Sequence, residues 1–293
     1  MQPPFDLSVI LAEAIDNPGL DRSLAAINCA CAGIPTEVLV VRPSGRPPLP
    51  ASDSLTLREI AAGESTPVPD RWGLGVAAAQ APIFACLTTE LEVYPDWARA
   101  VLAALRDGVV GTAGTIALKP GAGRVASAVY FVRFNAFLPQ SAATSHAGHN
   151  IPGDTGVYRR EAVMAYPELL SEGFWEADFH RRFRAEGKPL RLLDQPLAFF
   201  DTAIGLRAAM KLRAHHARGF GETRVARYGE SAYRLLLAAP LVPVVLLLRI
   251  LRRAAGSRGA FGLAIRVLPA LTLLCAAWGW GEATGAVAAR RSQ

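Results

Sequence analysis

The N-terminal part of the chain alternates short apolar runs with segments whose apolar residues recur at helical spacing. Strand-forming runs occur at Asp6–Leu11, Glu37–Val41 and Pro82–Leu87. Between the first two, Asp16-Asn17-Pro18 predicts a turn, and Leu20 to Cys31 carries an apolar residue at every third or fourth position. Unbroken apolar runs are typical of strands buried on both faces of a parallel sheet. The pattern therefore predicts strand, turn, helix and strand.

A second unit of the same kind follows. Thr56–Ala62 is compatible with a strand or a short helix, and the small residues of Gly75–Gln80 predict a helix that leads into the third strand. Strands that alternate with helices indicate right-handed crossovers and an α/β fold with a mainly parallel central sheet. Ligands of such sheets bind outside the carboxyl ends of the strands. We therefore expect functional residues just after Val41 and just after Leu87.

Polar residues concentrate in two short blocks of the second half, Gly153–Glu161 and Ser171–Arg182. The spacing predicts a loop, a short helix, another loop and then a longer helix that begins near Trp175. Glu176 and Asp178 fall on the first turn of this helix, where the helix dipole favours carboxylates. Capping alone would therefore also explain these two acids.

Five pieces of the chain follow one another at a recognisable spacing: Ser8–Leu11, Glu37–Val41, Phe84–Glu90 with Pro95–Trp97, Tyr158–Arg160, and Gly173–Glu176. In this order they resemble family two glycosyltransferases of the GT-A fold. The resemblance covers roughly residues 6–225. It implies an enzyme that transfers a hexose or similar sugar from a nucleotide diphosphate donor to a hydroxyl acceptor, usually with inversion.

The chain departs from this family at the metal-binding element. Where the family has Asp-x-Asp, this chain has Thr88-Thr89-Glu90, so the resemblance identifies it as a divergent member. The resemblance places these residues at the donor phosphates. It makes Glu90 the one carboxylate for a divalent cation (Mg²⁺ or Mn²⁺), with Glu92 as the alternative. Threonine hydroxyls are neutral and offset the desolvation of a hard cation poorly. Metal binding is thus expected to be weaker or absent, and both glutamates also fit an exposed loop.

The resemblance also assigns the acid–base chemistry. It makes Glu176 the expected general base that deprotonates the acceptor hydroxyl, with Asp178 as the alternative. Phe174 and Trp175 would form a partly apolar wall that raises the pKa of the base toward neutrality. Trp175 is either a platform on which a sugar stacks or a core tryptophan.

Further binding residues follow from the same resemblance. Asp154, in a glycine-flanked loop, is expected to accept hydrogen bonds from sugar hydroxyls, although a turn-capping aspartate fits equally well. Arg159 and Arg160 are adjacent and point apart, so only one of them is expected to face the acceptor, and Arg160 is the candidate.

On the donor side, Arg42 stands where the family often has an aspartate that contacts the nucleoside. A guanidinium there either reaches a phosphate or base, or is a solvated loop arginine. His215, His216 and Arg218 match a basic segment that closes over the pyrophosphate in related enzymes. None of these residues identifies the nucleotide or the sugar.

Charge divides the chain unequally. Residues 1–206 hold 17 Lys and Arg against 22 Asp and Glu, whereas residues 207–293 hold 14 against 3. We predict a glycosyltransferase domain over residues 1–225 and a basic, apolar helical region over residues 226–293 that associates with a membrane. Its two charge-free apolar runs, Leu235–Leu248 and Val267–Gly281, fall short of the roughly 20 residues that span a bilayer.

Helices that lie in the membrane interface therefore fit the tail better than a spanning hairpin. A basic helical cap on the enzyme or on a second copy is the alternative. Because a nucleotide sugar donor is cytoplasmic, we expect the protein at the cytoplasmic face of the cell membrane. The basic tail lacks the aromatic interleaving typical of nucleic-acid binding, so no nucleic-acid partner is expected.

Three hypotheses follow. The first is an inverting glycosyltransferase that acts on a lipid-linked or cell-envelope glycan acceptor, as in polysaccharide biosynthesis. The second is a catalytically inactive glycosyltransferase-like protein that binds a nucleotide sugar or a partner. The third, another nucleotide-binding α/β enzyme, is disfavoured because the chain has no glycine-rich phosphate loop.

Overall fold

The computed structural model describes residues 4–13, 19–52, 54–139, 150–226, 228–257 and 259–291, so the predicted turn at Asp16–Pro18 lies outside the described residues. The chain divides into two compact units. The first comprises residues 1–119 and 142–202, and the second comprises residues 120–141 and 203–293. The predicted glycosyltransferase domain over residues 1–225 stays a prediction. The membrane association of residues 226–293 stays a prediction.

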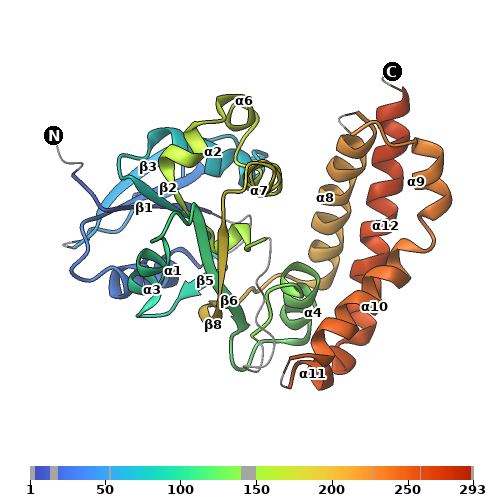
Figure 1. Ribbon diagram of the computed structural model, residues 1–293. Coiled ribbons are helices and arrows are strands. Elements are labelled where there is room, and N and C mark those ends of the chain that lie inside the picture. Colours follow the sequence, from blue (N-terminus) through green and yellow to red (C-terminus); the bar gives the residue numbers. More distant parts are fainter. Residues whose placement is uncertain are drawn as a thin grey trace. The chain divides into compact units, whose positions relative to one another are not determined.

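The first unit is built on one eight-stranded sheet of order β3-β2-β1-β4-β7-β6-β8-β5 (Figure 1). The predicted strands at the start of the chain are present, and Thr56–Ala62 is a strand. The strands are β1 (Leu7–Ala12), β2 (Thr36–Pro43), β3 (Thr56–Ala62), β4 (Ile83–Thr88), β5 (Leu91–Val93), β6 (Gly111–Leu118), β7 (Val157–Arg159) and β8 (Leu190–Phe200).

The expectation of a mainly parallel sheet is corrected, because the sheet is mixed. β3, β2, β1 and β4 are parallel neighbours, as predicted from the alternation of strands and helices. The short strand β7 then runs antiparallel to both β4 and β6, and β5 runs antiparallel to β8. A three-residue strand gives almost no periodic signal, so the reversal could not be predicted.

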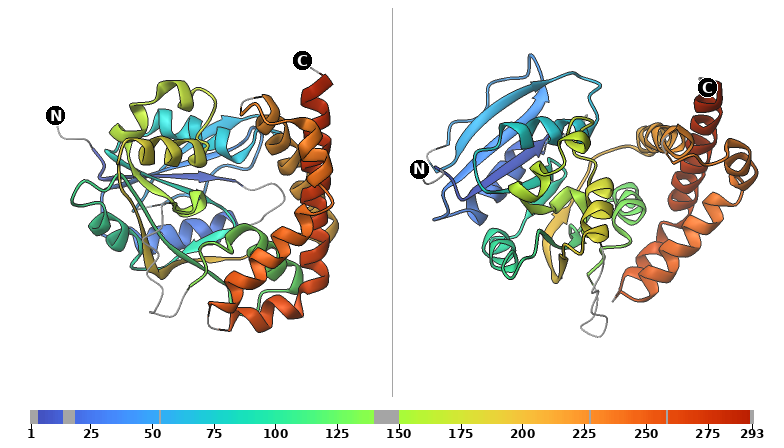
Figure 2. Two further views of the ribbon diagram at one scale, coloured as in Figure 1. Left: turned by 45° about the vertical axis from the view of Figure 1, so that its right-hand side comes forward. Right: turned by 45° about the horizontal axis from the view of Figure 1, so that its top comes forward.

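Helices cover both faces of this sheet (Figures 1 and 2). α2 and α7 pack over one face, where their apolar residues join Ile10, Leu39 and Phe84 in a single core cluster. α1 and α3 lie over the other face. The helical segments of this unit are α1 (Leu20–Ala30), α2 (Val68–Ala78), α3 (Trp97–Ala104), η1 (Gly153–Thr155), α5 (Arg160–Met164), α6 (Pro167–Leu170) and α7 (Glu176–Ala185).

Two predicted helices are present, one of them with different bounds. The helix expected at Gly75–Gln80 begins earlier, at Val68, and ends at Ala78. Pro69 occupies its first turn, where a proline costs no hydrogen bond, so the proline-rich segment belongs to the helix start. The helix expected near Trp175 is α7, with Trp175 as its N-cap residue.

The second unit is entirely helical in its described residues. It consists of α4 (Arg124–Phe134), α8 (Leu206–Ala226), α9 (Ala232–Ala238), α10 (Val242–Ala255), α11 (Ala260–Arg266) and α12 (Leu268–Arg291). α8 and α12 form its most extensive helix pair. Gly281 and Gly285 of α12 lie directly on the backbone of α8, where a Cβ would clash with the carbonyl oxygens of Ala214 and Arg218. The close approach requires glycine at both positions.

Among the described residues, no single helix is both long and apolar enough to cross a membrane. Two bent pairs have sufficient length and composition when taken together. These are α9 with α10, which are bent by 64°, and α11 with α12, which are bent by 78°.

Candidate active site

The order of the strands places a topological switch point between β1 and β4. From β1 the chain proceeds outward to β2 and β3, and then returns to the other side of β1 as β4. Ala12 and Thr88 pair at the carboxyl ends of these two strands. Thr89 then donates its backbone N–H to the carbonyl oxygen of Ala12 over 3.2 Å. Ligands of open α/β sheets bind at such a point.

The antiparallel strand β7 brings the loop of Asp154 to the same edge. Because β7 runs against β4, its start lies beside the end of β4, and the backbone N–H of Cys86 donates to the carbonyl oxygen of Gly156 over 2.9 Å. The short helix η1, Gly153–Thr155, therefore lies beside the carboxyl end of β4.

Glu176, the first residue of α7, reaches this loop. Its carboxyl group lies directly against Gly153, where a Cβ would come within 2.6 Å of Glu176 Cδ and 3.0 Å of Oε1. Only glycine leaves room for the carboxylate at this position. The structure thus brings together Asp154 and Glu176, two of the predicted site residues, with Asp178 two residues further along α7.

The electrostatics of Glu176 match the requirements for a base. Removal from water, followed by repulsion from Asp154 and Asp178, raises the pKa of Glu176 from 4.5 to about 7. A carboxyl with such a pKa is ionised in part at neutral pH and accepts a proton far more readily than an ordinary glutamate. The direction agrees with the sequence-based expectation. After burial, the largest cause that raises the pKa of Glu176 is repulsion from the charge of Asp154.

Behind the acids lies a buried aromatic and imidazole pair. The hydroxyl of Tyr158 on β7 and Nε2 of His180 on α7 form a hydrogen bond of 2.9 Å. Burial lowers the pKa of His180 to about 4, so the imidazole is neutral at pH 7. Burial also raises the pKa of Tyr158 and of Cys86, and the negative charges of Glu176 and Asp154 raise both pKa values further. The bond links β7 to α7 and so holds η1 and the helix start together.

Trp175 is exposed at the start of α7, with 45% of its surface accessible. Its indole Nε1 donates to the carbonyl oxygen of Glu172 over 2.9 Å. It is therefore not a core tryptophan, and its ring is available to a ligand. Gly173 lies two residues before Trp175 and has a φ of +97°. It packs so closely on Asp70 that a Cβ would clash with the carboxylate.

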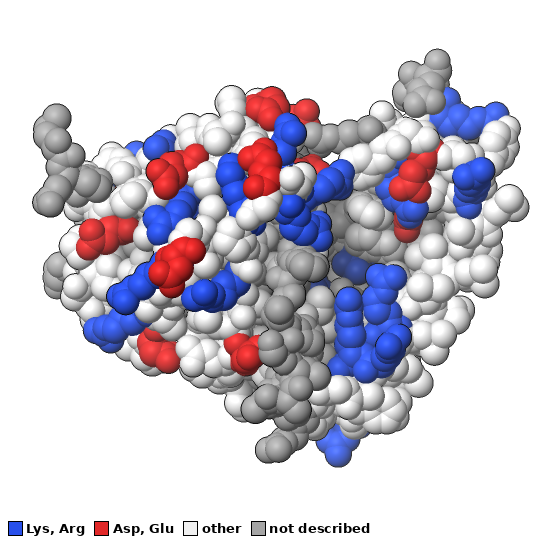
Figure 3. Space-filling view, viewed as in Figure 1, with Lys and Arg blue, Asp and Glu red and all other residues white. Residues whose placement is uncertain are grey.

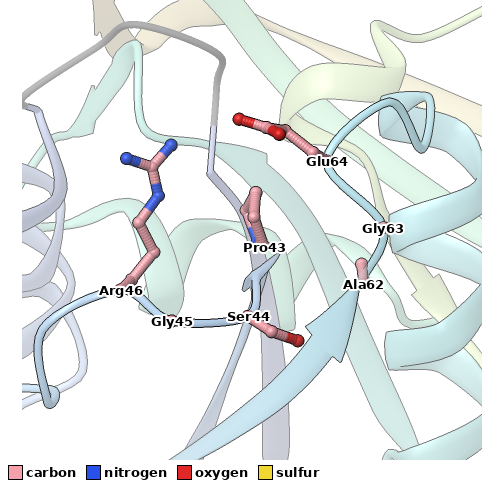
Figure 4. Close-up of a pocket in the computed structure, with 7 residues that line it drawn as sticks. All are labelled: Pro43, Ser44, Gly45, Arg46, Ala62, Gly63 and Glu64. Atoms are coloured by element: carbon pink, nitrogen blue, oxygen red, sulfur yellow. The ribbon is translucent and has the colours of Figure 1, made fainter.

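A cavity of about 390 Å³ opens at the same edge of the sheet, between the loops that follow β2 and β3 (Figure 4). It is lined by Pro43, Ser44, Gly45, Arg46, Ala62, Gly63 and Glu64. Arg46 and Glu64 extend from the two loops (Figure 4).

Three charged residues near this cavity, Glu13, Arg46 and Arg71, were not predicted from the sequence as site residues. Arg46 Nε lies 3.9 Å from Glu13 Oε1, just after β1. The buried Arg71 of α2 donates to the backbone carbonyls of Glu13 and, over 3.1 Å, of Glu64. Arg71 therefore ties the loops after β1 and β3 together. Its position two residues after Pro69 gave no signal of this role.

The predicted metal element offers a poor donor set. Thr88 and Thr89 are buried, and Thr88 Oγ1 has no hydrogen-bond partner in the described part of the chain. Glu92 is engaged by Lys119 at 2.5 Å and Arg22 at 3.5 Å. Among the described residues, no group of three or more His, Cys, Asp and Glu side chains could hold a metal ion. Glu90 alone would leave an ion dependent on phosphate and water ligands. The described residues thus provide no set of protein ligands that would hold a divalent cation without phosphate and water.

Two predicted binding residues have other surroundings. The guanidinium of Arg42 is buried, where Nη2 donates to Pro47 O over 2.5 Å and pairs with Glu59 over 2.6 Å. Arg160 follows β7, and its N–H donates to the carbonyl oxygen of Pro82, at the amino end of β4. The structure therefore places Arg160 at the edge of the sheet opposite Asp154, because β7 carries the chain away from the site.

The other predicted donor-binding residues belong to the second unit. His215, His216 and Arg218 are exposed on α8, and Arg218 pairs with Glu222 over 3.1 Å. Their role at the pyrophosphate stays a prediction.

No family model and no curated protein matches this chain. Solved structures do show similarity. One is S. aureus TarS 1–349 in complex with UDP-GlcNAc, with a TM-score of 0.48 and 12% identity, over 100% of this chain and 93% of that one. Another is the mannosyltransferase PcManGT from Pyrobaculum calidifontis in complex with GDP-Man and Mn²⁺, with a TM-score of 0.45 and 14% identity, over 100% and 76%. Similarity of this size assigns neither a family nor a function.

Proposed function

We propose that this protein is a glycosyltransferase that moves a sugar from a nucleotide diphosphate sugar to a hydroxyl group. The observation that carries the proposal is Glu176, whose pKa is raised to about 7 at the switch-point edge of the sheet, against Gly153 and beside Asp154. Raised carboxylate pKa values at such edges are a mark of acid–base sites.

The arrangement of the edge suits a long, anionic donor. The cavity lies between β2 and β3, and the acids lie between β4 and β7, which are three strand spacings apart in the sheet order. At about 4.8 Å per strand, the separation is about 14 Å. A nucleoside in the cavity would place its pyrophosphate over the ends of β1 and β4 and its sugar beside Asp154 and Trp175.

The proposed reaction is a single displacement. The acceptor oxygen forms a bond to the anomeric carbon as its proton passes to the carboxylate of Glu176. The bond between the anomeric carbon and the phosphate oxygen breaks, and the nucleoside diphosphate leaves. Attack from the face opposite the leaving group inverts the configuration. Asp154 orients sugar hydroxyls, and no step depends on a metal ion.

We also propose that the acceptor is a lipid-linked or cell-envelope glycan at the cytoplasmic face of the membrane. The basic and apolar composition of residues 207–293 supports this location. The alternative, a protein that binds nucleotide sugars without turnover, is favoured by the single acid at Thr88-Thr89-Glu90.

The experiment is a thermal-shift screen of the purified chain against uridine, guanosine and thymidine diphosphate sugars, with and without Mg²⁺ or Mn²⁺, followed by measurement of nucleoside diphosphate release. A donor that stabilises the fold identifies the nucleotide. We expect Glu176→Gln to bind this donor as the parent does and to release no nucleoside diphosphate. Binding without turnover by the parent on membrane acceptors would favour the alternative. If no nucleotide sugar stabilises the folded protein, both the transferase proposal and the binding-protein alternative are contradicted.

A further inference from the structure

The helical second unit exposes more large apolar side chains than the first. Of the 16 large hydrophobic side chains that are exposed among the described residues, 13 belong to this unit. The most exposed are Leu237 (82%), Trp280 (71%), Leu241 (64%) and Leu248 (61%). A concentration of exposed apolar surface indicates a partner that covers it.

Five of these side chains follow one another on α9 and α10. Leu237 lies at the end of α9, and Leu241 lies one turn later, at the start of α10. Val244, Val245 and Leu248 continue at three- and four-residue spacing, so on α10 they share the face of Leu241. The opposite face of α10 carries the buried Ile250 and Ala254.

A further exposed apolar side chain, Trp280, lies on α12. Its neighbour Gly279 packs on the bend between α9 and α10, where a Cβ would lie 3.1 Å from Pro243 Cδ and 3.2 Å from Ala239 O. The five side chains of α9 and α10, which we call the apolar ridge, are Leu237, Leu241, Val244, Val245 and Leu248.

Arginines stand at both ends of the apolar ridge. Arg252 continues the face of Leu241 and Leu248 one turn beyond Leu248, and Arg249 lies next to it, both exposed. At the other end Arg234 is exposed on α9, and the guanidinium of Arg290 lies 4.2 Å from the ring centre of Tyr233. Figure 3 shows one face of the unit, where Lys and Arg predominate among uncharged surface.

The carboxylates of the unit do not neutralise these arginines. Residues 120–141 and 203–293 hold 16 Lys and Arg but only three Asp and Glu. All three glutamates are already paired: Glu222 with Arg218 at 3.1 Å, Glu230 with Arg224 at 2.5 Å, and Glu282 also with Arg224. A second copy of this face would present the same unpaired positive charge, so the partner must bring negative charge and apolar surface together.

We propose that the apolar ridge and its flanking arginines bind the surface of an anionic lipid bilayer. α10 has 14 residues, which at helical rise is about 21 Å and shorter than the roughly 30 Å hydrocarbon core. The helices therefore lie in the interface, with the leucines in the outer acyl region and the arginines at headgroup phosphates. This inference deepens the membrane location in the proposed function, and it stands separately from the transfer reaction.

Vesicle flotation of the full chain tests the inference. The probes are vesicles of phosphatidylcholine alone and of phosphatidylcholine with phosphatidylglycerol, at low and high salt. We expect binding to the anionic vesicles, weakened by salt. Leu237→Ser with Leu241→Ser should reduce the partition coefficient at least tenfold. Arg249→Gln should reduce it about fivefold on anionic vesicles only. The matched control is Leu74→Ser, an exposed leucine of α2 in the first unit.

Three results would overturn the inference: no binding to either vesicle, equal binding to both, or binding that the paired leucine substitution leaves unchanged. A dimer in sedimentation that the same substitution dissociates would assign the ridge to a second copy instead. All variants are surface substitutions, and circular dichroism checks their fold. Thermal shifts with nucleotide sugars report on the first unit in the same samples, so failure of membrane binding and failure of the transfer proposal are told apart.

Discussion

Replacing Glu176 by glutamine tests the catalytic assignment through two opposite effects. Glutamine keeps the shape of the side chain and removes the charge. If Glu176 is the base, transfer is lost. If burial and repulsion from neighbouring acids destabilise the charged carboxylate of Glu176, removing the charge also makes the folded protein more stable.

The size of the second effect follows from the pKa of about 7 against an ordinary value of 4.5. The folded state holds the proton more tightly than the unfolded state, so stability falls as the pH rises above 4.5, and the loss is complete above about 7. At about 1.4 kcal/mol per pH unit, the charged carboxylate costs about 3 kcal/mol at pH 8.5 and less than about 1 kcal/mol at pH 5.

The assay is the melting temperature of parent and variant at both pH values. We expect Glu176→Gln to raise the melting temperature by roughly 5–10 °C at pH 8.5 and by much less at pH 5. Glu161→Gln, at an exposed glutamate of α5, is the control and should show no such gain. Equal melting temperatures at pH 8.5 would show that folding does not raise the pKa of Glu176. Equal transfer rates would show that Glu176 is not the base.

Four further predictions concern the same site. Gly153→Ala places a Cβ 2.6 Å from Glu176 Cδ, and the displaced carboxylate should slow transfer about a hundredfold with unchanged donor affinity. The transfer rate of the parent should fall to about a tenth of its plateau at pH 6, and Asp154→Asn should move this profile to lower pH because it removes the repulsion that raises the pKa of Glu176; an unmoved profile would exclude Asp154 as a cause. Tyr158→Phe removes the 2.9 Å bond to His180 and should cost about 1–2 kcal/mol in urea unfolding, whereas an unchanged midpoint would show that the bond is not structural. Treatment with EDTA should leave the thermal shift caused by the donor in place, because the described residues include no group of three or more His, Cys, Asp and Glu side chains that could hold a metal ion; loss of the shift would show that the donor binds together with a metal ion.

The sequence predicted the parallel half of the sheet because each of its strands carries its own signal. The runs at Asp6–Leu11, Glu37–Val41 and Pro82–Leu87 are apolar enough to be identified without partners, and β1, β2 and β4 are found there. β6 is rich in Gly, Ala and Thr, and β8 contains Asp194 and Pro196. Neither has a strand-like composition, and both form because they pair with each other.

The directions of the strands decide which of the predicted site residues the structure brings together. Asp154 and Glu176 were identified by resemblance, and the structure brings both to the end of β4. Arg160 was selected as the one of two adjacent arginines expected to face the acceptor. The intervening strand, β7, runs away from the site, so six residues of sequence separate opposite edges of the sheet. The direction of a strand depends on long-range pairing, which local patterns do not contain.

The helix α4 restricts how this protein can be divided for study. It lies in the chain between β6 and β7, yet it packs against α12, which ends at residue 291. During synthesis its buried face, which includes Tyr130, Phe131 and Phe134, has no α12 to cover it until residues 268–291 have emerged. A simple truncation after residue 202 would leave the same face bare and invite aggregation. An isolated fragment of the first unit would therefore need a short linker in place of residues 120–141 as well.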